Sequence, residues 1–228
     1  MKIYTKAFLL FLIIYSSVAY SETVGSELRY AQGLALQHAS LKIVESESSL
    51  LAEAKGKAER RNENLVLHLR HGNKIFVNTK ECRSVEREAE CVRYVFMAYS
   101  AGIHLFVVAE LPSEGWSFLL VDEKSGDSFH VKNFPVFSPD GKRFVVVRDS
   151  AIDGNFGLEL WVRKNNKYVM DWEGSPFYEG NYASYEINKW INGNEVDVLM
   201  TNENGQKNES SYRFVLKHAR NKWQVVSR

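Results

Sequence analysis

The chain is poor in cysteine and proline, and it has almost no net charge. Its 228 residues include two cysteines and four prolines, and 29 Lys and Arg offset 28 Asp and Glu to give a formal charge of +1. Two cysteines exclude the small folds that depend on several disulfides. A balanced charge provides no general attraction for DNA or RNA, so we expect no nucleic-acid partner.

Long apolar stretches are also missing, apart from residues 7–20, which follow Lys2 and Lys6. This run of 14 uncharged residues is shorter than the roughly 20 that a membrane-spanning helix needs. Small residues at Ala19 and Ser21 suit a cleavage site, so the pattern predicts a secretory signal peptide over residues 1–21, with an uncleaved anchor as the alternative. We expect a periplasmic or secreted protein that keeps no stable membrane anchor after cleavage.

Cys82 and Cys91 flank a charged segment of eight residues. In an exported protein such a pair favours a disulfide. Closing a ring of this size stabilises the fold by about 3 kcal/mol when chain entropy is counted alone. A metal site is the weaker alternative, because no Cys-x-x-Cys motif and no paired histidine accompanies the two cysteines.

The first part of the mature chain, residues 22–63, is predicted to be helical. Apolar residues recur at helical spacing over 22–40 and again over 48–62, where Ser48 and Ser49 are candidate caps. Residues 41–44 are β-branched and apolar enough to form a short strand between these helices. From residue 64 to 228 the pattern predicts β-strands, beginning with a hairpin over 65–78 and a strand over 92–98.

Three later segments share one layout, over about residues 99–132, 137–172 and 190–226. Each has an aromatic residue in an opening turn, then a long strand, a variable loop, a second strand, a tight turn and a third strand. The tight turns are predicted at residues 124–127, 164–167 and 218–221. Meander repeats of this length are typical of β-propeller blades.

The second repeat carries the most specific motif, Phe137-Ser138-Pro139-Asp140-Gly141-Lys142-Arg143-Phe144. Pro139, Asp140 and Gly141 suit a tight turn, and the apolar run that follows through Val147 suits a strand covered on both faces. Together with Leu158–Val162, the motif resembles the TolB-type, WD40-like (PD40) propeller repeat over residues 134–172. The resemblance implies blade-like structure and transfers no catalytic residue.

We therefore predict a mainly β fold of antiparallel, propeller-like meander repeats, partial or irregular, behind a short helical region. Closed propellers usually have at least four blades, and three repeats are visible beside the irregular region 41–98. That region provides a fourth sheet, or the repeats form an open stack. A β-sandwich is the alternative fold.

Motifs for catalysis or for a cofactor are lacking. The sequence contains no nucleophile elbow, no P-loop and no dinucleotide-binding fingerprint, and its histidines lack metal-ligand spacing. We expect no catalytic residue, no cofactor and no metal.

The connector over residues 171–186 is rich in aromatic, glycine and acidic residues. It is a candidate partner-binding loop, and the alternative is that its aromatic rings plug one end of the core. The candidate binding residues are Trp172, Glu173, Phe177, Tyr178, Glu179, Tyr182 and Tyr185.

The function that these features favour is non-catalytic binding in the cell envelope, with another protein or an envelope ligand as the partner. A first alternative is an inhibitor or immunity protein that acts on an exported hydrolase or toxin through the Cys82–Cys91 loop or the connector. A second is an envelope glycan hydrolase or lyase that uses Glu173, Glu179 or Glu186.

Overall fold

The computed structural model describes residues 40–79, 91–112, 115–148, 156–165, 167–178, 182–203 and 210–227. The predicted signal peptide lies outside these ranges, as do residues 22–39 of the first predicted helix. Within the ranges, no helix has both the length and the apolar character that a membrane crossing requires.

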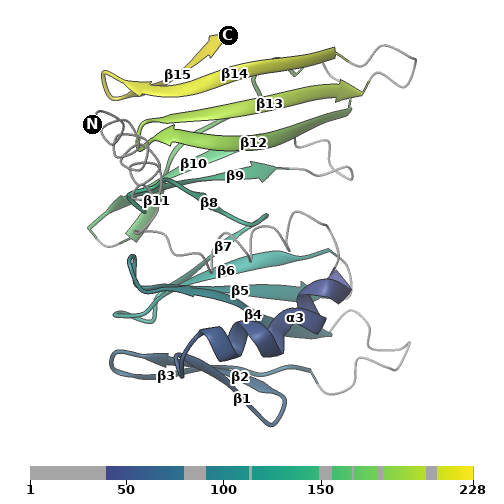
Figure 1. The fold of residues 1–228 in the computed structure, drawn as a ribbon, viewed down its shortest axis with the longest axis vertical. Helices are drawn as coiled ribbons and strands as arrows, with labels where there is room; N and C mark the ends of the chain where they lie inside the picture. The colour runs from purple at the N-terminus through teal and green to yellow at the C-terminus, as the bar shows by residue number, and fades with distance from the viewer. Residues whose placement is uncertain are drawn as a thin grey trace, which may run out of the picture.

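The described strands form four antiparallel sheets, and in each sheet every strand pairs with the next one along the chain (Figure 1). The first sheet contains Ala58–Arg61 (β1), Asn64–Leu69 (β2) and Gly72–Phe76 (β3). The second contains Val92–Ser100 (β4), Leu105–Pro112 (β5), Ser117–Asp122 (β6) and Ser128–Val131 (β7). The third contains Val136–Phe137 (β8), Arg143–Arg148 (β9), Gly157–Lys164 (β10) and Lys167–Gly174 (β11). The fourth contains Tyr182–Asn192 (β12), Glu195–Glu203 (β13), Ser210–Ala219 (β14) and Lys222–Ser227 (β15).

The mainly β, meander-repeat fold is confirmed, and the last three sheets correspond to the three predicted repeats. Each has the sequential four-strand order of a propeller blade. The predicted starts of the first and third repeats are wrong, because β4 and β12 are the first strands of their sheets. The physical reason is that the first strand of the second repeat, β8, has only two residues, so the layout of that repeat gives no sign of a long first strand in the other two.

The predicted turn of the motif is present and fixed by side-chain hydrogen bonds. The Gly141 amide donates to the Ser138 carbonyl at 2.8 Å, and Gly141 has a φ of 65° that favours glycine. The Ser138 hydroxyl donates to the Asp140 carboxylate at 2.8 Å and accepts from the Arg143 amide at 3.0 Å. These bonds set the register between β8 and β9.

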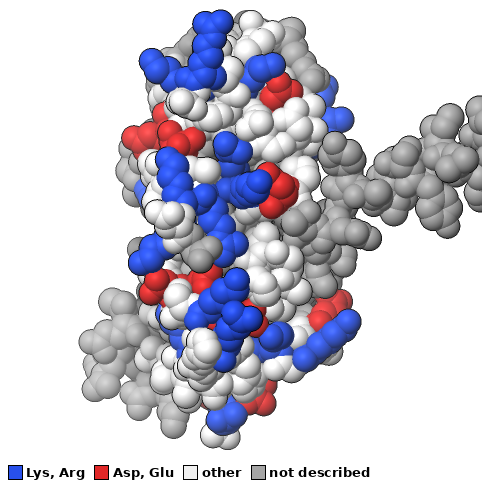
Figure 2. Space-filling view, turned by 90° about the vertical axis from the view of Figure 1, so that its left-hand side faces the viewer, with Lys and Arg blue, Asp and Glu red and all other residues white. Residues whose placement is uncertain are grey.

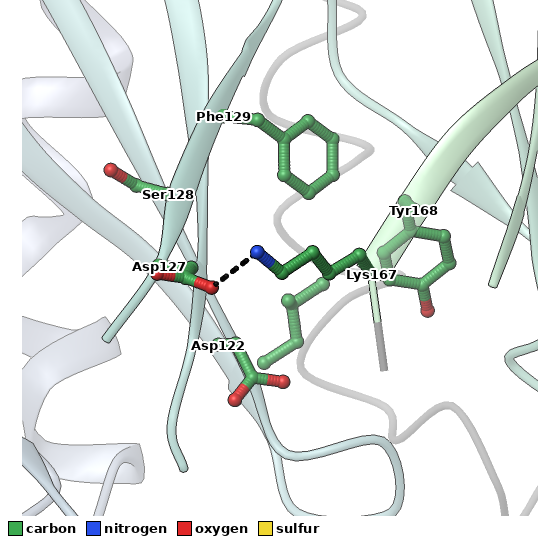
Figure 3. A pocket seen from close by; sticks show the side chains of 7 residues that line it. Asp122, Asp127, Ser128, Phe129, Lys167 and Tyr168 are labelled. Atoms are coloured by element: carbon green, nitrogen blue, oxygen red, sulfur yellow. Dashed lines mark ion pairs between the residues drawn. The ribbon is translucent and has the colours of Figure 1, made fainter. Parts of the chain in front are cut away.

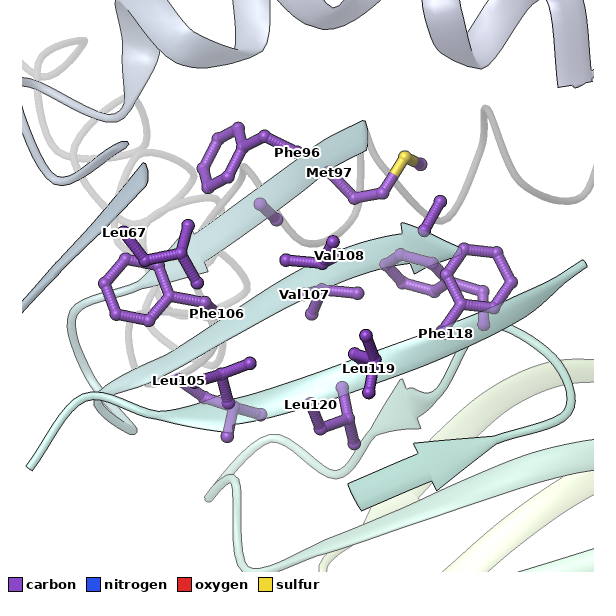
Figure 4. Packing of buried hydrophobic residues seen from close by; sticks show 14 of the residues in the cluster. Leu67, Phe96, Met97, Leu105, Phe106, Val107, Val108, Phe118, Leu119 and Leu120 are labelled. Carbon is purple, nitrogen blue, oxygen red and sulfur yellow. The ribbon is translucent and has the colours of Figure 1, made fainter. Parts of the chain in front are cut away.

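The third sheet is buried on both faces, as the apolar run predicts. Phe144 and Val146 belong to a core shared with the first two sheets, whereas Val145 belongs to a core shared with the fourth sheet. The first of these cores is filled by side chains of the second sheet, among them Phe106, Val108 and Phe118 (Figure 4). Alternating residues of one strand therefore join the two halves of the molecule.

The sheets form an open stack along the long axis of the molecule. Within the described part of the chain, the first and fourth sheets lie at opposite ends of this axis (Figure 1). The outer face of the fourth sheet is polar: Arg213 forms a bidentate pair with the buried Asp197, at 3.1 and 2.6 Å, and Lys217 pairs with Glu195 at 2.7 Å. Such a face suits the end of a stack that meets water. Four separate meanders also exclude the two-sheet sandwich for these residues.

The N-terminal region differs from its prediction. One helix, Ser40–Glu53 (α3), replaces both the strand predicted over 41–44 and the helix start at Ser48. Residues 58–61 form β1 rather than helix. The reason is tertiary: Leu50 and Ala54 pack into the core, and the Glu47 carboxylate accepts hydrogen bonds from the Phe96 amide at 2.7 Å and from Arg60. These contacts hold α3 against β4.

Candidate functional site

Tight turns from all four sheets lie along one edge of the stack, which we call the turn rim. It comprises residues 54–57, 70–71, 101–104, 123–127, 138–142, 165, 193–194 and 220–221, with the strand ends that adjoin them. The rim is continuous: Lys57 contacts Glu123, Asp122 contacts Arg163, and the Arg143 guanidinium donates to the Gly193 carbonyl at 3.0 Å. Figure 2 views the molecule from this side.

The turn between β6 and β7 is the centre of the rim. The Gly126 amide donates to the Asp122 carbonyl at 2.9 Å, and the Asp122 carboxylate accepts from the amides of Lys124 and Ser125. From the first sheet, the Lys74 ammonium donates to the Gly126 carbonyl and the Ser128 hydroxyl, each at 2.9 Å. The turn is therefore held on its own strands and by the neighbouring sheet.

A cavity of about 290 Å³ opens beside this turn, between the second and third sheets (Figure 3). The Lys167 ammonium reaches across from β11 to the Asp127 carboxylate at 3.2 Å, and both side chains are largely exposed, at 72% and 58%. An exposed pair of this kind contributes at most about 1 kcal/mol. A ligand group can therefore separate it at little cost. The lining residues are Leu105, Asp122, Asp127, Ser128, Phe129, Lys167 and Tyr168.

The walls of the cavity are fixed by buried contacts. The Tyr168 hydroxyl donates to the Gly141 carbonyl at 2.7 Å, and burial raises the pKa of Tyr168. The Phe129 ring stacks on Trp161 with centroids 5.7 Å apart. Behind them, Arg163 lies over the Tyr168 ring and donates to the Asp122 carboxylate at 3.2 Å. The cavity is preformed, which limits the ordering cost of binding.

A second polar cluster on the rim surrounds Glu123. Its carboxylate accepts hydrogen bonds from Lys57 at 2.6 Å, from Tyr99 at 2.8 Å and from His104 at 2.8 Å, and its side chain is 8% exposed. Burial by itself raises the pKa of Glu123, but these donors outweigh burial and lower the pKa to about 2. The group stays ionised near neutral pH with its oxygens occupied, so its role is to join the first two sheets.

The predicted connector is not one continuous loop. Trp172 and Glu173 lie in β11, Phe177 and Tyr178 in the turn that follows, and Tyr182 and Tyr185 in β12; Glu179 lies outside the described residues. Trp172, Tyr178 and Tyr185 pack against the core between the third and fourth sheets. The Tyr185 hydroxyl donates to the Pro176 carbonyl at 2.7 Å, and burial raises its pKa to about 12.

These aromatic rings therefore plug the core, which was the alternative to a binding loop. Phe177 is 37% exposed and stacks on Tyr212 with centroids 5.2 Å apart. Glu173 pairs with Arg148 at 3.6 Å. A binding role for this segment stays a prediction, and it falls mainly to these two exposed side chains.

The predicted disulfide involves a cysteine outside the described residues, Cys82. Cys91 is described and is not a free thiol. The pairing of the two stays a prediction.

The lining of the cavity was not predicted as a site, although a signal for it exists in the sequence. The predicted turns 124–127 and 164–167 hold equivalent positions in successive repeats. Equivalent turns of stacked blades lie next to each other, so this correspondence already places Asp127 beside Lys167. Which side chains line a cavity depends on the distance and angle between sheets, which the sequence pattern does not specify.

Comparison with known proteins adds little. No family model matches the chain, and neither does any curated protein. One solved structure, from a structural and mechanistic analysis of two prolyl endopeptidases, aligns with 14% sequence identity and a TM-score of 0.26. The alignment covers 90% of this chain and 42% of the other, so the chain spans less than half of that protein. A TM-score this low carries no argument about fold or activity.

Proposed function

We propose that this protein is an exported, non-catalytic binding module of the cell envelope, which holds its partner against the turn rim. The observation that carries the proposal is the preformed cavity between the second and third sheets, which has the exposed pair Lys167–Asp127 at its mouth. A concave site with fixed apolar walls and a few polar groups at its mouth is the usual form of a binding site. The propeller-like order of the sheets supports it, because equivalent turns of adjacent blades together form one surface.

The glycan hydrolase alternative has less support. Glu173 lies on the face of the third sheet that is turned toward the second sheet, because it pairs in register with Glu159 opposite Val146. Glu186 lies on the outer face of the fourth sheet, since its neighbours Tyr185 and Ile187 point into the core. Both sheets lie between these carboxylates, and stacked sheets are about 10 Å apart. They do not form the close pair that glycoside hydrolysis uses.

The inhibitor alternative depends on the Cys82–Cys91 loop, most of which lies outside the described residues, and on the connector. The connector contributes Phe177 as an exposed apolar side chain, 37% exposed. No contact in the described residues favours this alternative over binding at the turn rim.

Site-specific photo-crosslinking in cells tests the proposal. A photoreactive amino acid in place of Ser125, at the tip of the central turn, should give an adduct of defined mass after irradiation. The matched control replaces Ser211, an exposed residue of β14 on the outer face of the fourth sheet. An adduct from position 125 alone supports a partner on the turn rim. No adduct from position 125, or equal adducts from both positions, contradicts it.

A further inference from the structure

The exposed charge of the turn rim is mainly positive, although the whole chain is nearly neutral. Figure 2 shows Lys and Arg side chains in a column that runs over all four sheets. Two acidic residues of the rim, Asp122 and Glu123, are buried and already engaged by Arg163 and Lys57. The exposed cations of the rim are Lys55, Arg70, Lys124, Lys142, Lys164, Lys167, Arg220 and Lys222.

Several of these cations have no partner among the described side chains. Lys142 and Lys167 form exposed pairs with Asp140 and Asp127, at 3.9 and 3.2 Å, and Lys164 pairs with the half-buried Asp171 at 3.4 Å. No ion pair joins Lys55, Arg70, Lys124, Arg220 or Lys222 to another residue in the described ranges. These side chains spread over the first, second and fourth sheets, so the positive field extends along the rim rather than around one point.

The cavity opens within this positive surface, and its lining is mixed. Leu105, Phe129 and the ring of Tyr168 give it apolar walls, while Lys167 and Asp127 stand at its mouth. At about 290 Å³ it is of a size to accept one bulky apolar or aromatic side chain. Lys124 lies within the turn between β6 and β7, which forms one wall of the cavity, and the Arg70 amide donates to the Glu123 carbonyl of the same turn at 2.9 Å.

Resting on the proposed binding function, we infer that the partner is a protein with an exposed acidic segment that carries one bulky apolar side chain. The apolar side chain enters the cavity. A carboxylate of the segment replaces Asp127 on Lys167, and the flanking acids meet Arg70 and Lys124. A neutral sugar polymer fits less well, because it carries no negative charge to complement Arg70, Lys124 and Lys167. An anionic membrane would bind the positive surface alone and would leave the cavity without a role.

Fluorescence anisotropy with a labelled Glu-rich peptide containing one central Trp tests the inference on the mature full-length protein. Exchanging Trp for Ala in the peptide should weaken binding roughly tenfold, equivalent to about 1.4 kcal/mol. Raising the salt from about 50 to 200 mM should weaken it further, because exposed charges are screened. In the protein, Arg70→Glu with Lys124→Glu should abolish binding. Arg93→Glu with Lys132→Glu, which makes the same change in charge at exposed positions away from the turn rim, should leave it intact.

Blocking the cavity separates the apolar contribution from the charge. Ser128→Trp places an indole at the mouth and should reduce binding of the Trp peptide to the level of the Ala peptide, whereas Ser211→Trp should not. Equal binding of the two peptides, or equal loss in both charge-reversed variants, overturns the inference. So does binding to dextran sulfate or anionic lipid vesicles without binding to the Trp peptide. If an adduct still forms from position 125 in cells, the proposed function survives such a result and only the chemistry of the partner is wrong.

Discussion

Removing the charge of Glu123 should destabilise the joint between the first two sheets. In Glu123→Gln the side chain keeps its size but loses the carboxylate that accepts from Lys57, Tyr99 and His104. One pKa unit corresponds to about 1.4 kcal/mol, so lowering the pKa from 4.5 to about 2 corresponds to about 3 kcal/mol. Lys57 and His104 are each 42% exposed, and water screens part of their interaction. We expect a loss of about 2 kcal/mol at pH 7.

The pH dependence of this loss gives a stricter test. Because the folded state lowers the pKa of Glu123, its contribution is complete above pH 4.5 and disappears as the pH falls toward 2. The stability difference between wild type and Glu123→Gln should therefore be present above pH 4.5 and shrink as the pH falls from 4.5 to 3. Urea unfolding followed by circular dichroism at several pH values measures it.

A matched control is the exposed carboxylate Glu59 of β1, which pairs with Arg61 of the same strand at 2.5 Å. The hydrogen bond from Arg61 also lowers the pKa of Glu59, but both side chains are well exposed, so Glu59→Gln should leave the unfolding midpoint unchanged. A stability difference for Glu123→Gln that does not change between pH 7 and 3 would refute the reasoning. An equal loss in Glu59→Gln would refute it too.

Three further predictions concern other parts of the fold. Asp197→Asn breaks the bidentate pair with Arg213 at a fully buried carboxylate and should cost about 3 kcal/mol in urea unfolding. Glu195→Gln, at the less buried pair with Lys217 on the same strand, should cost less. Gly157→Ala would place a Cβ 2.6 Å from the Gly174 carbonyl oxygen and should lower the free energy of unfolding by about 2 kcal/mol. The control Gly115→Ala, whose Cβ would meet nothing within 4 Å, should cost less, and a larger loss of stability at Gly115 contradicts the prediction. Mass spectrometry of a non-reduced digest should find Cys82 and Cys91 in one linked peptide, and Cys91→Ser should lower stability by about 2 to 3 kcal/mol; free thiol in the native protein contradicts the pairing.

The sequence predicted the sheets better than their ends. Strands such as β9 and β13 follow from alternating or continuous apolar runs next to recognisable turns, and burial of Phe144 through Val146 on both faces follows from the absence of any polar position between them. β12 was missed because its first residues continue a stretch rich in glycine and aromatic residues. Only pairing with β13 shows that Tyr185 and Ile187 point inward.

The candidate site depends on contacts that no local pattern contains. Asp127 and Lys167 hold equivalent turn positions in successive repeats, but whether they line a cavity together with Ser128 is decided by how the second and third sheets stack. Glu123 is similar, because its partners come from the turn before β1, from β4 and from the turn before β5. The helix α3 was misplaced for the same reason, since the contacts of Glu47 and Leu50 outweigh the local preference of residues 41–44 for a strand.

An open stack has consequences for how the molecule loosens. Each sheet is held only by its immediate neighbours, so unfolding can begin at either end without disturbing the middle. The end sheets should therefore exchange their amide hydrogens soonest, while Phe144, Val145 and Val146, enclosed from both sides, should exchange only on global unfolding. The cavity lies at the boundary between the second and third sheets. A bound segment there would clamp the two most protected layers together and slow the separation of one half of the molecule from the other.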